Sequence, residues 1–177
     1  MFRNVLLGLD FSPSADDALT AAIELAERHG GRLTIVTAIP EVHGWATGPV
    51  ETMTAASQLN AQLEREAIAL QHRALERVPA CLPVSTIIRR APARKALLEA
   101  LRDGRHDTLV IGASSCHTRF RVTRSLTRCL VRHAGVPVLV AERDGPPRLI
   151  MPPAVDEAAP EVAPPAPAGA PPRSAPT

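Results

Sequence analysis

Residues 5–39, VLLGLDFSPSADDALTAAIELAERHGGRLTIVTAI, decide the fold. The apolar run at 5–9 predicts a buried strand, and Ser12 followed by Pro13 is typical of a helix N-cap and first helical residue. Apolar residues then recur every three or four positions until a glycine pair ends the helix. A second apolar run at 33–39 predicts another strand. The stretch therefore predicts a strand, a helix and a parallel strand in sequence.

The same alternation continues as far as residue 144. Further strands are predicted at 84–88, 108–111 and 136–141, and further helices at 52–77, 93–102 and 123–133. Short β-rich runs that alternate with helical stretches are typical of a parallel sheet with crossover helices. The predicted fold is α/β: an open five-stranded parallel sheet with four helices, doubly wound and Rossmann-like.

The chain changes character at residue 145. Residues 146–177 carry 11 of the 18 prolines, mixed mainly with alanine, and show no apolar periodicity. Such a segment cannot bury enough surface to offset the entropy lost on ordering. We therefore expect one domain at 1–144 and a disordered or polyproline-like tail at 145–177, which acts as an inert linker rather than as a docking segment.

Composition excludes several classes of protein. The net charge of +2 is too small for a dedicated nucleic-acid binder, and aromatic residues, at 2% of the chain, are too few for a base-stacking platform. Three cysteines without C-x-x-C spacing fit neither a disulfide framework nor a zinc site, so we expect no metal and a reducing cytoplasm. The first apolar run is too short for a signal sequence or a membrane span.

Ligands of open parallel sheets bind beyond the carboxyl ends of the strands, where the strand order reverses. Asp10 follows the first predicted strand, Ala38 lies near the end of the second, and a loop begins at Gly112 after the fourth. We expect these three positions to lie close together.

Two segments resemble the universal stress protein family. Residues 5–39 are similar to the opening of these proteins, and residues 109–142, LVIGASSCHTRFRVTRSLTRCLVRHAGVPVLVAE, are similar to their ending. The resemblance covers residues 1–143 and implies the adenine nucleotide alpha hydrolase-like form of the fold. It also implies a cytoplasmic stress-response protein that works as a regulatory or interaction module. A homodimer paired through the strand at 136–141, with ATP and Mg²⁺ as ligands, belongs to the same expectation.

ATP-binding members of the family carry the loop G-x-x-G-x(9)-G-[S/T] after the fourth strand. Here Gly112 keeps the first glycine, whereas Ser115 and Arg124 take the places of the second and third, and Ser125 takes the hydroxyl position. Only eight residues separate Ser115 from Arg124. The ligand-contacting residues that the resemblance implies are Gly8, Asp10, Ala38, Gly112, Ser115, Arg124, Ser125 and Leu126.

The altered loop leaves two alternatives for the ligand. Serine and arginine fit poorly where a glycine brings the backbone close to phosphate. The loop is also rich in basic residues, so side chains such as Arg119, Arg121 and Arg124 would hold an anion instead, or the site would be empty. Asp10 likewise contacts a ligand or only stabilises its own turn.

Three functions compete at this stage. The first is a nucleotide-responsive stress protein, and the second is an interaction module that needs no ligand. The third, which we favour least, is a basic surface for RNA built from Arg89, Arg90 and the arginines of 119–132. No catalytic motif is present, so we do not expect an enzyme.

Overall fold

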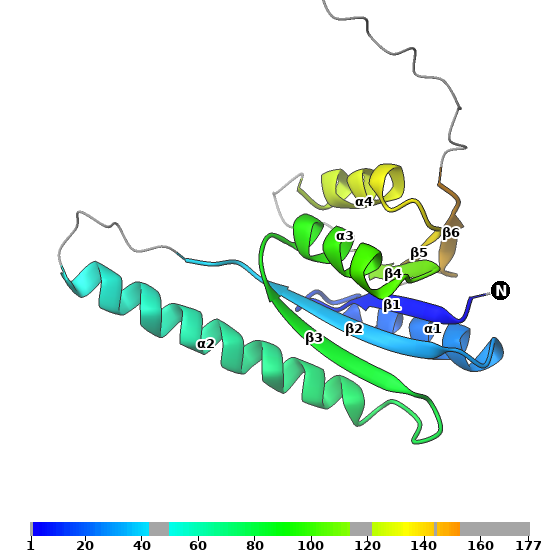
Figure 1. Cartoon of the computed structure of the whole chain (residues 1–177), viewed down its shortest axis with the longest axis horizontal. Helices are drawn as coiled ribbons and strands as arrows, with labels where there is room; N and C mark the ends of the chain where they lie inside the picture. The colour runs from blue at the N-terminus through cyan, green and yellow to red at the C-terminus, as the bar shows by residue number, and fades with distance from the viewer. Residues whose placement is uncertain (1, 43–49, 114–121, 144, 153–177) are drawn as a thin grey trace, which may run out of the picture.

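The computed structural model describes residues 2–42, 50–113, 122–143 and 145–152, without the side chains of 50–53 and 122–125. Six strands form one sheet in the order β3-β2-β1-β4-β5-β6, with four helices around it (Figure 1). The elements are β1 (Asn4–Gly8), α1 (Ala15–Arg28), β2 (Arg32–Ile39), α2 (Val50–Leu75), β3 (Val84–Arg90), α3 (Ala93–Gly104), β4 (Thr108–Gly112), α4 (Val122–His133), β5 (Val138–Ala141) and β6 (Arg148–Ile150). The predicted α/β class is confirmed, although the sheet has one strand more than predicted.

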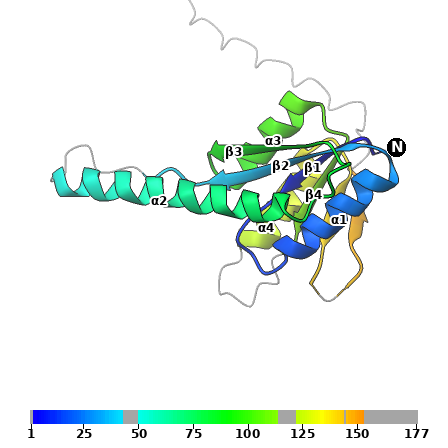
Figure 2. The same ribbon diagram turned by 90° about the horizontal axis from the view of Figure 1, so that it is seen from below.

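The central strand β1 explains why both faces of the sheet are covered. Val5, Leu6 and Leu7 are all fully buried. Because successive side chains of a strand point to opposite faces, Val5 and Leu7 pack in one core cluster and Leu6 packs in the other. Helices α1 and α2 cover the first face and α3 and α4 cover the second (Figures 1 and 2).

The strand order reverses at β1. Its neighbours are β2 on one side and β4 on the other, both parallel to it. The register places Gly8, the last residue of β1, between Val36 of β2 and Ile111 of β4. The carboxyl ends of these three strands therefore meet at one edge of the sheet, where the predicted ligand site belongs.

The first helix starts later than its sequence predicts. Helix α1 begins at Ala15 with Ser14 at the N-cap, so the prediction of Ser12 as N-cap and Pro13 as first helical residue is wrong. The hydroxyl of Ser12 donates to Asp10 Oδ1 instead of capping the helix. The backbone carbonyl of Ser12 accepts a hydrogen bond from Ala15 N at 3.1 Å, which closes a turn before the helix.

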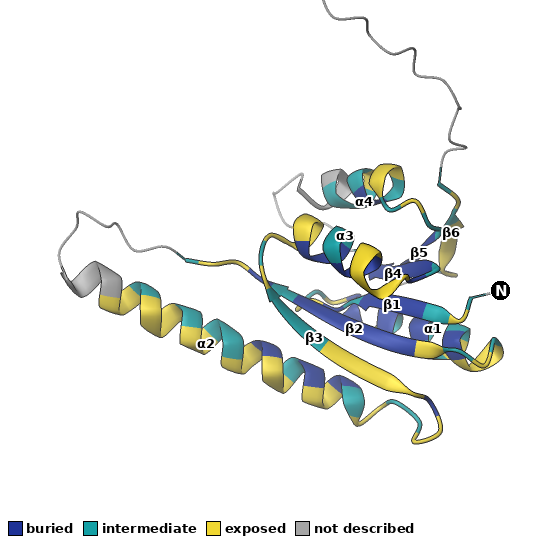
Figure 3. Ribbon diagram, in the orientation of Figure 1, coloured by how far each residue is buried: buried dark blue, intermediate teal, exposed yellow. Residues whose placement is uncertain are grey.

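Helix α2 extends well beyond the sheet (Figure 1). Among its described side chains only Ala67, Gln71 and Ala74 are buried, and the remainder are half-buried or exposed (Figure 3). Gln71 Nε2 donates to the Ile87 carbonyl at 2.9 Å and to Thr37 Oγ1 at 3.2 Å. One buried amide thus joins the helix to both β3 and β2.

The C-terminal part of the sheet differs from the predictions in three respects. Strand β5 begins at Val138 rather than at 136, and residues 148–150 form β6, which pairs antiparallel with β5. The prediction of a tail without regular structure from 145 onward is therefore wrong for 148–150. Residues 153–177 of that predicted tail lie outside the described residues. The homodimer expected through the strand at 136–141 finds no open edge there, because β4 and β6 pair with the two sides of β5.

Within the described ranges, no helix combines the length and the apolar character that a membrane span requires. The same ranges contain no group of three histidine, cysteine or acidic side chains arranged to hold a metal ion.

Candidate functional site

A cavity of about 90 Å³ lies where the carboxyl ends of β1, β2 and β4 meet. Its walls come from these three strands and from α3 and α4, so it lies on the α3/α4 face of the sheet. Five of the predicted site residues line it, namely Gly8, Asp10, Ala38, Gly112 and Leu126. The cavity is therefore the place to which the fold brings these residues, although they are far apart in the sequence.

The other three predicted site residues belong to the segment after β4. Ser115 lies outside the described residues. Arg124 and Ser125 belong to the first turn of α4, whose backbone the structure places, but their side chains are outside the description. The altered phosphate loop is thus located at its two ends, by Gly112 and by the start of α4.

Sequence reasoning missed half of the cavity wall. The additional lining residues are Leu9, Val36, Ala93, Leu97, Ile111 and Thr127. Val36 lies two positions before Ala38 on the same strand, so the alternation of strand side chains was a signal for it. No motif marks Ala93 or Leu97, because a helix face reaches the site only through the tertiary packing of α3.

Gly8 makes room for a side chain of α3. A Cβ atom at this position would lie 3.0 Å from Leu97 Cδ2 and 3.3 Å from Ile111 Cγ2, which is tighter than ordinary van der Waals contact. The missing side chain therefore lets Leu97 pack down onto β1, where it is 5% exposed. Leu97 fills space at the base of the cavity and keeps it small.

Gly112 has a structural role before any ligand is considered. A Cβ atom here would lie 2.6 Å from Ser14 Oγ and 3.0 Å from the Ser14 carbonyl oxygen. Ser14 is fully buried at the start of α1, so it cannot move aside easily. The first glycine of the loop is therefore required by the contact between β4 and α1.

Asp10 stabilises its own turn and remains exposed. Its Oδ1 atom accepts hydrogen bonds from Ser12 N at 3.0 Å and from Ser12 Oγ at 2.5 Å. The Ser12 and Ser14 hydroxyls lie 3.2 Å apart, which extends the network to the start of α1. Both Ser12 bonds use the same carboxylate oxygen of Asp10. The turn-stabilising role is thus observed, and it is compatible with a ligand contact through the second oxygen.

The two arginines that end β3 do not form a free basic surface. Arg89 pairs with Asp103 at 2.8 Å and Arg90 pairs with Glu64 at 2.5 Å. Both arginines of the basic surface expected for RNA are therefore paired with carboxylates, which offset their positive charge. Of the other basic residues predicted for an RNA surface, 119 and 121 lie outside the described residues.

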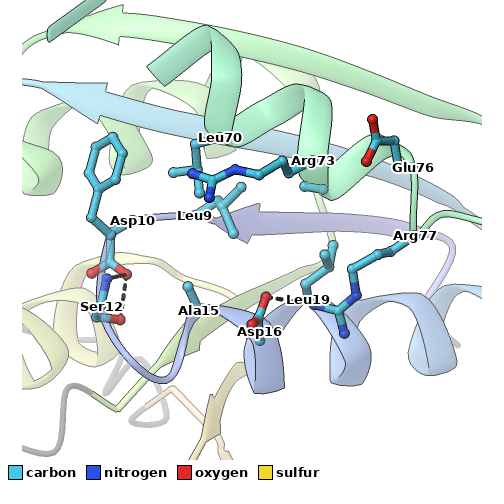
Figure 4. Close-up of a pocket in the computed structure, with 12 residues that line it drawn as sticks. Leu9, Asp10, Ser12, Ala15, Asp16, Leu19, Leu70, Arg73, Glu76 and Arg77 are labelled. Atoms are coloured by element: carbon cyan, nitrogen blue, oxygen red, sulfur yellow. Dashed lines mark hydrogen bonds and ion pairs between the residues drawn. The ribbon is translucent and has the colours of Figure 1, made fainter. Parts of the chain in front are cut away.

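A second and larger hollow opens on the opposite face, between α1 and α2 (Figure 4). Its volume is about 640 Å³, and Leu9 and Leu19 contribute apolar surface to it. Arg77 crosses the cleft and pairs with Asp16 at 2.6 Å, while its second guanidinium nitrogen donates to Thr20 Oγ1 at 3.0 Å. Asp10 lines both hollows because its loop leaves β1 between the two helical layers.

Solved structures similar to this chain share its fold. A universal stress protein from Lactobacillus plantarum aligns with a TM-score of 0.62 and 21% identity over 79% of this chain and 97% of its own. The hypothetical protein MJ0577 aligns with a TM-score of 0.66 and 18% identity over 82% and 99% of the two chains. A universal stress protein in complex with cAMP aligns with a TM-score of 0.54 and 20% identity over 79% and 97%.

Comparison with curated proteins finds no match. The sequence model of the universal stress protein family, in contrast, matches residues 1–142 of the 177. This range includes every strand and helix except β6. The chain belongs to the universal stress protein family.

Proposed function

We propose that this protein binds an adenine nucleotide in the cavity between β1, β2 and β4, and that the bound nucleotide regulates a stress response. The observation that carries the proposal is the convergence of Gly8, Asp10, Ala38, Gly112 and Leu126 at the point where the strand order reverses. The similar structure with bound cAMP supports an adenine nucleotide as the ligand class. ATP with Mg²⁺ is the form that we test first.

The cavity chemistry suits the base of a nucleotide. Its walls are mainly aliphatic, with Val36, Ala38, Leu97 and Leu126 among them. The second carboxylate oxygen of Asp10 is available to accept a hydrogen bond from an amino group or a ribose hydroxyl. Because about 90 Å³ is far less than the roughly 300–1,000 Å³ of common ligand sites, only part of the nucleotide enters, and the phosphates lie outside the cavity.

The phosphates would lie at the start of α4. The first backbone N–H groups of a helix have no partner within the helix and attract anions. The first turn of α4 contains no acidic residue, and Arg124 and Ser125 belong to it. We propose that the positive charge of arginine here holds the phosphates in place of the close backbone contacts that the two missing glycines would allow, since guanidinium groups bind phosphate strongly.

Calorimetric titration with ATP and Mg²⁺, AMP and cAMP tests the site. Ala38→Phe places a large ring in the cavity and should weaken binding at least tenfold. Ala61→Phe, at an exposed position of α2, makes the same change far from the cavity and should bind as the parent chain does. If none of the three nucleotides binds the parent chain, or if Ala38→Phe binds like Ala61→Phe, the proposed site is wrong.

Asp10 requires two variants, because it has two roles. Asp10→Asn keeps an oxygen that accepts from Ser12 but removes the charge and the second acceptor. Asp10→Ala removes the turn bonds as well. We expect both variants to bind nucleotide more weakly, and only Asp10→Ala to lower the melting temperature of the free protein. Gly112 is unsuitable for this purpose, because any side chain there collides with Ser14.

We further propose that the nucleotide is bound without being hydrolysed and that the protein works in the cytoplasm. Phosphate release from ATP should stay at the rate of buffer alone under conditions where binding is saturated. Free Cys81 and Cys129 are compatible with a reducing compartment. The homodimer stays a prediction, and it requires a surface other than the edge of β5.

A further inference from the structure

Strand β6 occupies the edge of β5. Val138 lies opposite Ile150, Leu139 opposite Leu149 and Val140 opposite Arg148, all in an antiparallel ladder. On its other side β5 pairs with β4. All four residues of β5 are buried, so an apolar strand that would otherwise end the parallel sheet is paired along both sides.

The connection between the two strands favours pairing within one chain. Only residues 142–147 separate β5 from β6, a length close to the median of roughly four to six residues for connections between elements. Arg148 Nη1 lies 3.8 Å from Glu142 Oε1, which places the two ends of the connection side by side. Ile150 packs against the core cluster on the α3/α4 face. A short tether of this kind holds β6 at a high local concentration beside β5.

Proline pairs limit β6 at both ends. Pro146 and Pro147 precede the strand, and Pro152 and Pro153 follow it in the sequence. Only residues 148–151 between them carry backbone N–H groups, and alternate N–H groups of a strand point to opposite edges. The outer edge of β6 therefore has few donors for a further strand. Short edge strands bounded by proline are a common protection against edge-to-edge association.

We propose that residues 146–152 are an edge cap, in which the chain's own β6 takes the place beside β5 that a second copy would otherwise take. The cap ends the sheet and prevents this protein from associating through β5. This inference does not rest on nucleotide binding. Leu149 and Met151, which are 48% and 63% exposed, show that the segment is held by its pairing and by Ile150 rather than by burial of every apolar side chain.

Engineered cysteine pairs test which chain supplies β6. The full chain, with Cys81, Cys116 and Cys129 replaced by serine, receives Leu139→Cys with Leu149→Cys, or Val138→Cys with Ile150→Cys. Adjacent pairs of an antiparallel ladder alternate between hydrogen-bonded and non-hydrogen-bonded geometry, so one of the two pairs has the closer spacing that a disulfide needs.

After mild oxidation, at least one pair should form a disulfide within a single chain, seen as a monomer band in non-reducing denaturing electrophoresis. A covalent dimer would show that β6 pairs with the β5 of another copy and would overturn the proposal. Failure of both pairs to form a disulfide would also overturn it, because β6 would then not lie beside β5.

A proline variant tests what the cap prevents. Ile150→Pro removes a backbone donor and fits the ladder poorly, whereas Ile150→Val keeps the donor and a β-branched side chain. In sedimentation equilibrium of the full chain, Ile150→Pro should show a mass that rises with concentration well beyond that of the parent. Ile150→Val should match the parent. An Ile150→Pro chain that keeps the helical circular dichroism and the mass of the parent would refute the capping role, and if it fails to fold, the cysteine pairs decide the question alone.

Discussion

His106 lies at the end of the sheet opposite the candidate site, two residues before β4 begins. Burial lowers the pKa of this imidazole below its usual value of 6.5, and the nearby charge of Arg32 lowers it further. A hydrogen bond with the Asn4 backbone and the charge of Asp107 act in the opposite direction but do not outweigh burial. The Nδ1 atom is buried without a hydrogen-bond partner among the described residues. The folded protein therefore favours the neutral ring.

This lowered pKa predicts that acid weakens the fold. As the pH falls through 6.5, the unfolded chain takes up a proton at His106 that the folded chain resists, so the free energy of unfolding decreases until the pH passes the folded pKa. Urea denaturation at pH 7.5 and 5.5 should show this loss. The loss of unfolding free energy between the two pH values should be smaller in His106→Gln than in the parent chain. In the control His72→Gln, which changes an exposed histidine, the loss should equal that of the parent. If both variants lose the same unfolding free energy between pH 7.5 and 5.5, His106 is not the cause of the acid effect.

At the scale of elements, Gln71 shows how α2 is fixed to the sheet. Its buried amide donates to β3 and β2. Gln71→Leu leaves the Ile87 carbonyl without this donor and should cost about 1–3 kcal/mol of unfolding free energy. Gln62→Leu makes the same change at an exposed position of the helix, where the amide only contacts Glu66, and should cost less than about 0.5 kcal/mol. Urea denaturation measures both, and similar costs would contradict the anchoring role.

The elements that the sequence predicts correctly share one property. Their apolar runs are bounded by strong turn residues, so local patterning and tertiary packing point to the same structure. β6 was missed because Arg148–Ile150 lies among prolines and is a strand only by virtue of its pairing with β5. Ser12 was misplaced because a carboxylate two residues earlier competes for its hydroxyl.

The candidate site divides in the same way. Asp10, Ala38 and Gly112 could be placed from the sequence, because strand ends in a parallel sheet converge by topology alone. Leu97 could not, since its position depends on how closely α3 approaches the bare backbone of Gly8. The reason why position 112 requires a glycine could not be predicted either, because the residue that a side chain there would meet, Ser14, is distant in the sequence.

At the scale of the whole molecule, the sheet separates two apolar clusters, one on each of its faces. Ile35 belongs to the cluster on the α1/α2 face and Ile111 to the cluster on the α3/α4 face. Their strands flank β1, which places them roughly 10 Å apart at the usual strand spacing, with side chains on opposite faces. The two positions should therefore be energetically independent although they stabilise the same fold.

Ile35→Val and Ile111→Val should each lower the unfolding free energy by about 0.5–1.5 kcal/mol, because each deletes one buried methylene. The double variant should lose the sum of the two within about 0.5 kcal/mol, as expected for sites without shared partners. Urea denaturation followed by circular dichroism should still show a single transition, because both clusters share the strands of one sheet. A coupling well above that limit would mean that packing changes pass through β1, and two separate transitions would mean that the layers unfold independently.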